Sequence, residues 1–149
     1  GIIKILKGHQ KCLYLGNLKS KRDWGHAKEF VDAQWKILQY KTPDDFVIAT
    51  GKNYSVKDLV NLVLKKLKIK YLWKKDKKGY EYAIAQNDIG QIKKSQIIIK
   101  QEKIYFRPNE VHNLVGDYRK ATKLLKWKPK IKFDRLISEM IDSDLKNII

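Results

Sequence analysis

Three consecutive elements in the first half of the chain constrain the fold most: a helix, a buried strand and a second helix. Apolar residues recur at steps of three and four over residues 26–40, which predicts an amphipathic helix. The run FVIAT at 46–50 is continuous and largely apolar and ends at Gly51, which is typical of a strand buried on both faces of a parallel sheet. Ser55 opens the second helix, with Asp58 three residues later at capping-box spacing. This succession predicts an α/β fold.

The other expected elements are less regular, but together they suit one domain of 149 residues. They are a helix end over 1–7, a short strand over 12–15, strands over 69–73 and 97–99, an extended segment over 105–108, a helix capped by Asp117 that ends before Pro129, and a last amphipathic helix over 133–145. The stretch between the two later strands has little periodicity. It is left unassigned, apart from a lysine-rich excursion at 74–78.

The net charge of +17 at pH 7 suggests an anionic partner, because clustered Lys and Arg attract phosphates without regard to sequence. Only four of the 33 basic residues are arginines, at positions 22, 107, 119 and 135, and the lysines are spread along the chain. This pattern favours solvated lysine faces and disfavours nucleic acid as a partner. A free-standing nucleic-acid or polyanion-binding module remains the alternative function. Because lysine is so common here, the arginines are the more informative cations.

Cysteine usage and hydropathy disfavour several other classes of protein. Cys12 is the only cysteine, so no internal disulfide can form, and this predicts a cytoplasmic protein. The three histidines stand far apart, without Cys or acidic residues at metal-ligand spacing, so we expect no metal site. No run approaches the roughly 18 apolar residues of a membrane span, so we expect no membrane contact. The chain starts with Gly1, which predicts that it begins inside a longer protein.

The residues needed for dinucleotide-dependent chemistry are missing. A dinucleotide site of the doubly wound kind requires a glycine-rich turn between a strand and a helix, and the eight glycines here are scattered. Tyr71 and Lys75 have the Tyr-x-x-x-Lys spacing of short-chain dehydrogenases, but they fall on an expected strand, where that spacing does not bring the side chains together. We therefore assign no catalytic, cofactor-binding or metal-binding residue.

A series of motifs, in the same order along the chain, resembles the GDP-mannose 4,6-dehydratases, a family of extended short-chain dehydrogenase/reductases. The most specific is LGNLKSKRDWGHAKEFV at residues 15–31, which places an arginine, an acid, an indole and a glycine directly before a helix. The others are DFVIATG at 45–51 with Ser55-Val56, YFRPNEV at 105–111, Gly116-Asp117 with Lys120-Ala121, and LKWKP at 125–129.

The resemblance implies a parent lyase that converts GDP-mannose to GDP-4-keto-6-deoxymannose with NADP. In the family the catalytic Thr, Glu and Tyr-Lys residues, the glycine-rich turn and most cofactor contacts precede the part that this chain matches. Residues 1–149 are therefore expected to be the last part of a doubly wound, Rossmann-like parallel sheet plus the smaller α/β substrate-binding domain. Such a chain would bind a GDP-sugar without turning it over. Its partner would be the missing N-terminal half or a homo-oligomer, and its unpaired sheet edge predicts self-association or marginal folding.

Four residues are carried over from the family as contacts to the substrate. Arg22 and Arg107 match arginines that face the nucleotide diphosphate, whose forked oxygens a guanidinium binds bidentately. Glu110 matches an acid near the ribose or sugar hydroxyls, and Asn17 lies where the family holds the guanine side of the ligand. From the residues alone, a simple surface ion pair that includes Arg22 or Glu110 stays open.

Two positions depart from the family pattern in the loop that carries Glu110. Asn109 replaces a commoner Thr or Ala, and His112 replaces an Asp, which changes the charge beside the proposed ribose contact. Elsewhere, Trp24 and Trp127 are interpreted as core anchors, and His26 as a structural residue at a helix start.

Overall fold

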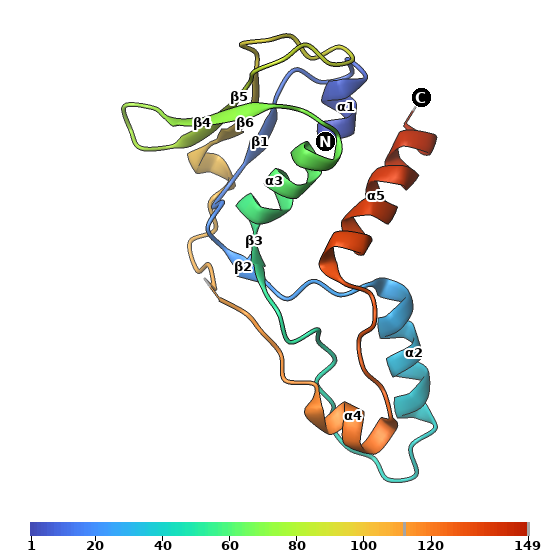
Figure 1. The fold of residues 1–149 in the computed structure, drawn as a ribbon. Coiled ribbons are helices and arrows are strands. Elements are labelled where there is room, and N and C mark those ends of the chain that lie inside the picture. Colours follow the sequence, from blue (N-terminus) through green and yellow to red (C-terminus); the bar gives the residue numbers. More distant parts are fainter. Residues whose placement is uncertain (112, 149) are drawn as a thin grey trace.

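The structure is a computed structural model that describes residues 1–111 and 113–148, and it is elongated (Figure 1). A four-stranded sheet with α1 and α3 lies at one end, α2 and α4 lie at the other, and α5 runs from the α2 end towards α1. In chain order the elements are α1 (Ile2–Leu6), β1 (Leu13–Leu15), β2 (Lys21–Arg22), α2 (Ala27–Leu38), β3 (Tyr54–Ser55), α3 (Val56–Lys66), β4 (Tyr71–Lys75), β5 (Glu81–Ala85), β6 (Ile97–Gln101), a 3-10 turn (Lys103–Tyr105), α4 (Arg119–Leu125) and α5 (Phe133–Asn147).

The four-stranded sheet is mixed and has the order β1-β6-β5-β4. Strands β1 and β6 are parallel, with Leu13 opposite Ile99, whereas β6–β5 and β5–β4 are antiparallel. Strands β2 and β3 form a separate antiparallel pair, in which Arg22 lies opposite Tyr54. Helices pack against this sheet, so the predicted α/β class is confirmed. The expected strands near 69–73 and 97–99 are β4 and β6, and β5 falls in the stretch that has no periodicity.

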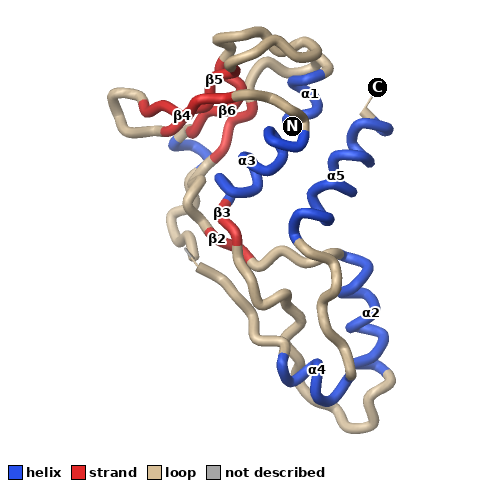
Figure 2. The backbone as a smooth tube through the Cα atoms, in the orientation of Figure 1, coloured by secondary structure: helices blue, strands red, loops and turns tan. Residues whose placement is uncertain are grey.

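The expectation of a buried strand at 46–50 is wrong. The segment forms no strand, because no other part of the described chain lies beside it in hydrogen-bonding register, and Figure 2 shows it as a loop between α2 and β3. Phe46 and Ile48 pack with residues of α2 and α4, whereas Val47 is 54% exposed. At the end of the segment, the backbone N–H of Thr50 donates to the carboxylate of Asp23 (2.8 Å) rather than to a strand.

Side-chain caps set the start of α2 and of α3, as the sequence predicts. Nδ1 of His26 accepts a hydrogen bond from the N–H of Lys28 (3.1 Å), which satisfies one of the free donors of the first turn of α2. In α3 the Ser55 hydroxyl accepts from the N–H of Asp58 (3.0 Å), and the Asp58 carboxylate accepts from the N–H of Ser55 (2.8 Å). The hydrogen bonds from Ser55 lower the pKa of Asp58 below its ordinary value.

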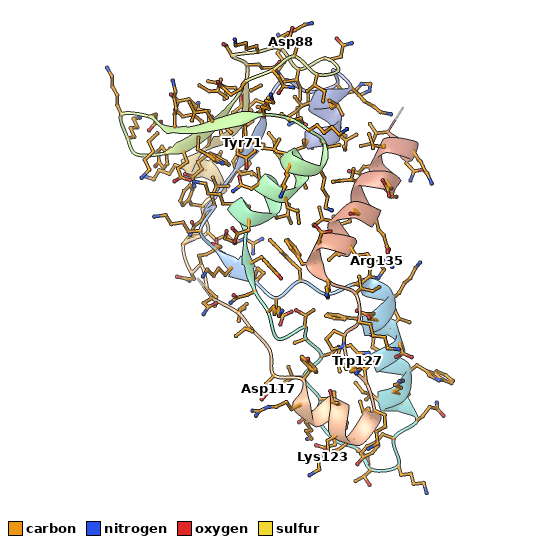
Figure 3. The ribbon with its side chains drawn as sticks, viewed as in Figure 1. Tyr71, Asp88, Asp117, Lys123, Trp127 and Arg135 are labelled. Carbon is orange, nitrogen blue, oxygen red and sulfur yellow. The ribbon has the colours of Figure 1, made fainter. Side chains whose placement is uncertain are left out.

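Buried apolar side chains form three clusters that join the elements. The first fills the space between the sheet and helices α1 and α3, the second lies between α3 and α5, and the third joins α2 to α4 and to the loop at 46–50. Trp127 is in the third cluster, between α2 and α4 (Figure 3), and its rings lie edge-on to Phe30 (6.4 Å) and Tyr118 (6.2 Å). The interpretation of Trp127 as a core anchor is confirmed.

Candidate functional site

The structure brings together two of the four predicted site residues, which lie 88 positions apart in the sequence. Arg22 lies on β2, and its guanidinium forms an ion pair with the carboxylate of Glu110. The same guanidinium donates to the backbone carbonyls of Val111 (2.6 Å) and Lys21 (2.8 Å). The side chains of Arg22 and Glu110 are only 25% and 13% exposed, so the pair is largely withdrawn from water. The ion pair that was open from the sequence is therefore present.

Within the described residues, the ion pair occupies only part of the donor capacity of the Arg22 guanidinium. Its Nη1 and Nη2 groups donate to the acceptors described above, while Nε–H has no acceptor among residues 1–111 and 113–148. An arginine carries five N–H donors in a rigid fork. A phosphate oxygen can thus use the remaining donors, or it can compete with Glu110 for the occupied ones.

Arg107 lies three residues before Glu110 on the same segment, and its side chain is exposed. Within the part of the chain that the structure describes, its guanidinium has no ion-pair or hydrogen-bond partner. The expected extended segment at 105–108 is confirmed only in part: Tyr105 ends the 3-10 turn, and Phe106 is extended (φ −80°, ψ 134°). Arg107 is therefore a cation without a partner among the described residues, on the segment that carries the partner of Arg22.

Asn17 lies in the turn that follows β1, close to the segment that carries Arg107. Its Oδ1 accepts from the N–H of Lys19 (2.9 Å). It lines a cavity of about 250 Å³, whose other walls come from the β4–β5 hairpin, from Gln101 and from Phe106. The rings of Tyr80 and Phe106 lie 5.8 Å apart at this cavity. Three lysines line this cavity among the described residues, whereas Arg22, Arg107 and Glu110 do not. Asn17 therefore lies next to Phe106, on the segment that carries Arg107, and not at the ion pair between Arg22 and Glu110.

Close backbone packing holds these two segments together. The N–H of Glu102 donates to the carbonyl of Leu15 (2.9 Å), which continues the β1–β6 pairing. A Cβ atom at Gly16 would collide with the backbone carbonyl of Tyr105, so only glycine allows this approach. The position of Asn17 relative to Arg107 is thus set by the parallel strands β1 and β6.

Asp23 is a residue whose role the sequence does not reveal. Its Oδ1 accepts from the N–H (2.8 Å) and the hydroxyl (2.5 Å) of Thr50, and its Oδ2 accepts from the N–H groups of Gly51 (2.9 Å) and Gly116 (3.3 Å). The sequence offers one indirect sign of this role: the residues that donate to Asp23 belong to the DFVIATG and Gly116-Asp117 motifs. Each motif is visible in the sequence, but their meeting at one carboxylate is a tertiary feature.

Two further residues of the RDWGH run have packing roles. The ring of Trp24 stacks on Phe133 (5.4 Å) in the second cluster, as expected of an anchor, and it also lines a cavity of about 450 Å³. Nε2 of His26 lies 3.0 Å from a carboxylate oxygen of Glu139 on α5. Because Nδ1 of this ring accepts from Lys28, Nε2 carries the proton and donates. Hydrogen bonds from Arg135 and then from His26 lower the pKa of Glu139 below its ordinary value.

Among the described residues, no group of three or more His, Cys, Asp and Glu side chains is placed to hold a metal ion. No helix within residues 1–111 and 113–148 has the length and apolar character needed to cross a bilayer. His112, the predicted change of charge beside Glu110, lies outside the described residues.

Known proteins match this chain over nearly its whole length. Residues 1–140 match the family model described as GDP-mannose 4,6 dehydratase. The GDP-mannose 4,6-dehydratase of Vibrio cholerae is 40% identical over 149 residues, covering 98% of this chain and 40% of that protein. The GDP-mannose 4,6 dehydratase of Homo sapiens is 38% identical over 146 residues, covering 97% and 37%. The chain therefore spans about 40% of the length of the curated relatives it matches.

This chain also matches solved structures with the same fold, and in each case it covers less than half of the solved chain. RMD from Pseudomonas aeruginosa complexed with NADPH has a TM-score of 0.69 and 16% identity, over 99% of this chain and 40% of that chain. The dTDP-glucose 4,6-dehydratase from Bacillus anthracis in complex with NAD has a TM-score of 0.64 and 17% identity, over 98% and 38%. At such identities the likeness concerns the fold alone.

Proposed function

Since the chain belongs to the GDP-mannose 4,6-dehydratase family, we propose that it is the portion of such an enzyme that binds the GDP-sugar substrate. The parent reaction would convert GDP-mannose to GDP-4-keto-6-deoxymannose and water. Residues 1–149 would supply substrate contacts, and the catalytic Thr, Glu and Tyr-Lys residues would lie in the remaining length of a family-sized chain. Turnover by this portion alone is not expected. We further propose that the enzyme works in the cytoplasm, because this reducing compartment keeps a free thiol such as that of Cys12 reduced.

The observation that supports this proposal most is the contact between Arg22 and the segment that carries Arg107 and Glu110. It brings the segments of two arginines, from motifs that are distant in the sequence, into one part of the molecule. A diphosphate offers paired oxygens that two guanidinium groups can clamp, and lysines bind such oxygens only as point charges. In a chain whose positive charge is almost entirely lysine, arginines at this place favour specific diphosphate recognition.

The described residues do not fit NADP. A dinucleotide pyrophosphate needs a glycine-rich turn that leads from a strand into a helix. Here β1 leads through a turn into β2, and the β3–α3 junction is a capping box with Ser55 and Asp58, without glycine. We therefore propose that NADP binds to the other part of a family-sized protein.

We further propose that this other part, or a second copy of the chain, covers an exposed apolar surface at the α2 end. Val31, Trp35 and Leu38 share one face of α2 and are 62%, 62% and 77% exposed. The loop at 46–50, which has no partner strand among the described residues, lies next in the chain. Contiguous exposed apolar side chains of this kind mark contact surfaces.

The α2 surface predicts self-association of the chain on its own. We expect size-exclusion chromatography with light scattering to show oligomers, and the double substitution Trp35→Glu, Leu38→Glu to shift the population towards monomer. The control is Lys36→Glu, on the same helix but outside this face, which should leave the oligomers unchanged. A monodisperse monomer with a sharp thermal transition in the unsubstituted chain would contradict the prediction.

Isothermal titration of residues 1–149 tests the proposed function. We expect saturable binding of GDP and of GDP-mannose at one site, and weaker binding of GMP because it lacks the second phosphate. A short single-stranded oligonucleotide, titrated at about 50 and about 200 mM salt, represents the polyanion alternative, whose affinity would fall steeply with salt. If the oligonucleotide binds in this way while neither GDP nor GDP-mannose binds, the proposed function is wrong.

A further inference from the structure

The carboxylate of Asp23 connects three separate segments of the chain, one of which carries Arg22. Asp23 follows Arg22 directly, so the two residues share one stretch of backbone. Its oxygens accept from Thr50 and Gly51, at the turn that leads to β3, the partner strand of β2. Thr50 and Gly51 supply three of these hydrogen bonds, and the fourth comes from the N–H of Gly116, six residues after Glu110. One side chain thus links the stretch that carries Arg22 to the turn before β3 and to Gly116, six residues after Glu110.

The backbone around Asp23 is built for close approach. Gly51, whose N–H donates to Oδ2 of Asp23, has φ +72°, a conformation that strongly favours glycine. A Cβ atom at Gly116 would collide with the side chain of Ala49, so the Gly116 N–H reaches the same oxygen only because it has no side chain. Both glycines therefore serve the contact with this carboxylate.

The hydrogen bonds also require a carboxylate and not merely a polar group. Each oxygen of Asp23 accepts from two donors, and none of the described Lys or Arg side chains forms an ion pair with it. An asparagine has the same shape, but its NH₂ group would face the N–H of Thr50 at one position or the N–H groups of Gly51 and Gly116 at the other. The substitution Asp23→Asn therefore removes either the bond from the Thr50 N–H or the bonds from the Gly51 and Gly116 N–H groups, and it also removes the negative charge, with almost no change in side-chain volume.

We infer that Asp23 is a positioning residue for nucleotide-diphosphate binding: it holds β2 and the segment that carries Arg107 and Glu110 at the separation at which Arg22 and Arg107 act on one ligand. This inference rests on the proposed function. Hydrogen bonds from main-chain N–H groups to a charged carboxylate are stronger than those between neutral groups, so the network is suited to hold a fixed geometry. In catalytic sites, a misplacement of about 1 Å can lower the reaction rate about 100-fold, and we expect a smaller loss of affinity when a binding site is displaced in the same way.

The test compares four forms of the chain by titration with GDP and with guanosine: unsubstituted, D23N, R22Q and the double variant. We expect D23N to weaken GDP binding about tenfold and to leave guanosine binding unchanged, since guanosine lacks the diphosphate. In the R22Q background the further loss from D23N should be less than about twofold, because coupled residues act through the same contact. Asp32→Asn removes one exposed carboxylate from α2 and serves as the charge-matched control, with GDP affinity unchanged.

A milder variant keeps the inference testable if D23N does not fold. Thr50→Val removes the hydroxyl that donates to Asp23 and accepts from the N–H of Lys52, and we expect it to weaken GDP binding by a few fold, with helix content by circular dichroism retained. The positioning role is overturned if folded D23N or Thr50→Val binds GDP as the unsubstituted chain does, or if the losses for GDP and guanosine are equal. If the unsubstituted chain binds no GDP, the proposed function fails, and the role of Asp23 fails with it.

Discussion

Replacement of Trp127 by alanine is expected to lower the free energy of unfolding by about 3–5 kcal/mol, the range for deletion of a large aromatic side chain from a core. The side chain is 2% exposed and fills the cluster that joins α2 to α4. Its Nε1–H also donates to the backbone carbonyl of Glu29 (3.0 Å), which would lose its partner in α2. Urea denaturation followed by far-ultraviolet circular dichroism measures the change without relying on tryptophan fluorescence.

Trp35→Ala is the matched control for Trp127→Ala, because it removes the same side chain from the opposite environment. Trp35 is 62% exposed on α2, so we expect a change within about 0.5 kcal/mol of zero at concentrations where the chain is monomeric. Comparable losses in both variants would mean that Trp127 is not the anchor of this end of the molecule.

Arg22→Gln and Arg107→Gln are each expected to raise the Kd for GDP about 10- to 100-fold. A hydrogen bond to a charged group contributes about 1.5–3 kcal/mol, and about 1.4 kcal/mol corresponds to a factor of ten in affinity. The two variants should differ in the unbound chain: Arg22→Gln leaves the carboxylate of Glu110 without its partner and should also lower the melting temperature, whereas Arg107 has no described partner to lose. Titration calorimetry and thermal melts separate these effects.

Arg119 provides the control for this pair of substitutions. The side chain of Arg119 is 89% exposed and forms an ion pair with its neighbour Asp117, whose pKa it lowers to about 2 through hydrogen bonds. Arg119→Gln removes the same charge away from the candidate site, so GDP affinity should stay the same. Equal losses of affinity for Arg22→Gln and Arg119→Gln would indicate general attraction of phosphates by a basic surface.

Much of the local structure follows from short-range sequence signals. The starts of α2 and α3 were predictable because a cap is formed by residues two or three positions apart, as with Ser55 and Asp58. The strand β5 was not predictable, because the pattern of its side chains is irregular and its pairing with β6 shifts register near Ala83. The apolar run at 46–50 misleads for a related reason. Such a run indicates burial and β propensity, but a strand also needs a neighbour, and no described segment supplies one.

For the candidate site, too, the sequence identifies the residues and the structure decides their contacts. Motif order alone selected Asn17, Arg22, Arg107 and Glu110 as candidate ligands, but their mutual contacts are not encoded at any fixed spacing. The structure decides that Arg22 meets Glu110 and that Asn17 faces a lysine-lined cavity instead. Their affinity for a ligand remains a prediction.

By itself, the sequence determined the α/β class, the helix starts and the family to which the chain belongs, since periodicity, caps and ordered motifs are properties of neighbouring residues. Only the tertiary structure decided that the 46–50 segment is a loop and that the Asp23 carboxylate joins segments at 50–51 and 116. The physical reason is that a hydrogen bond between residues 27 or 93 positions apart forms only after the intervening chain has folded, and nothing in the local pattern states where that chain returns.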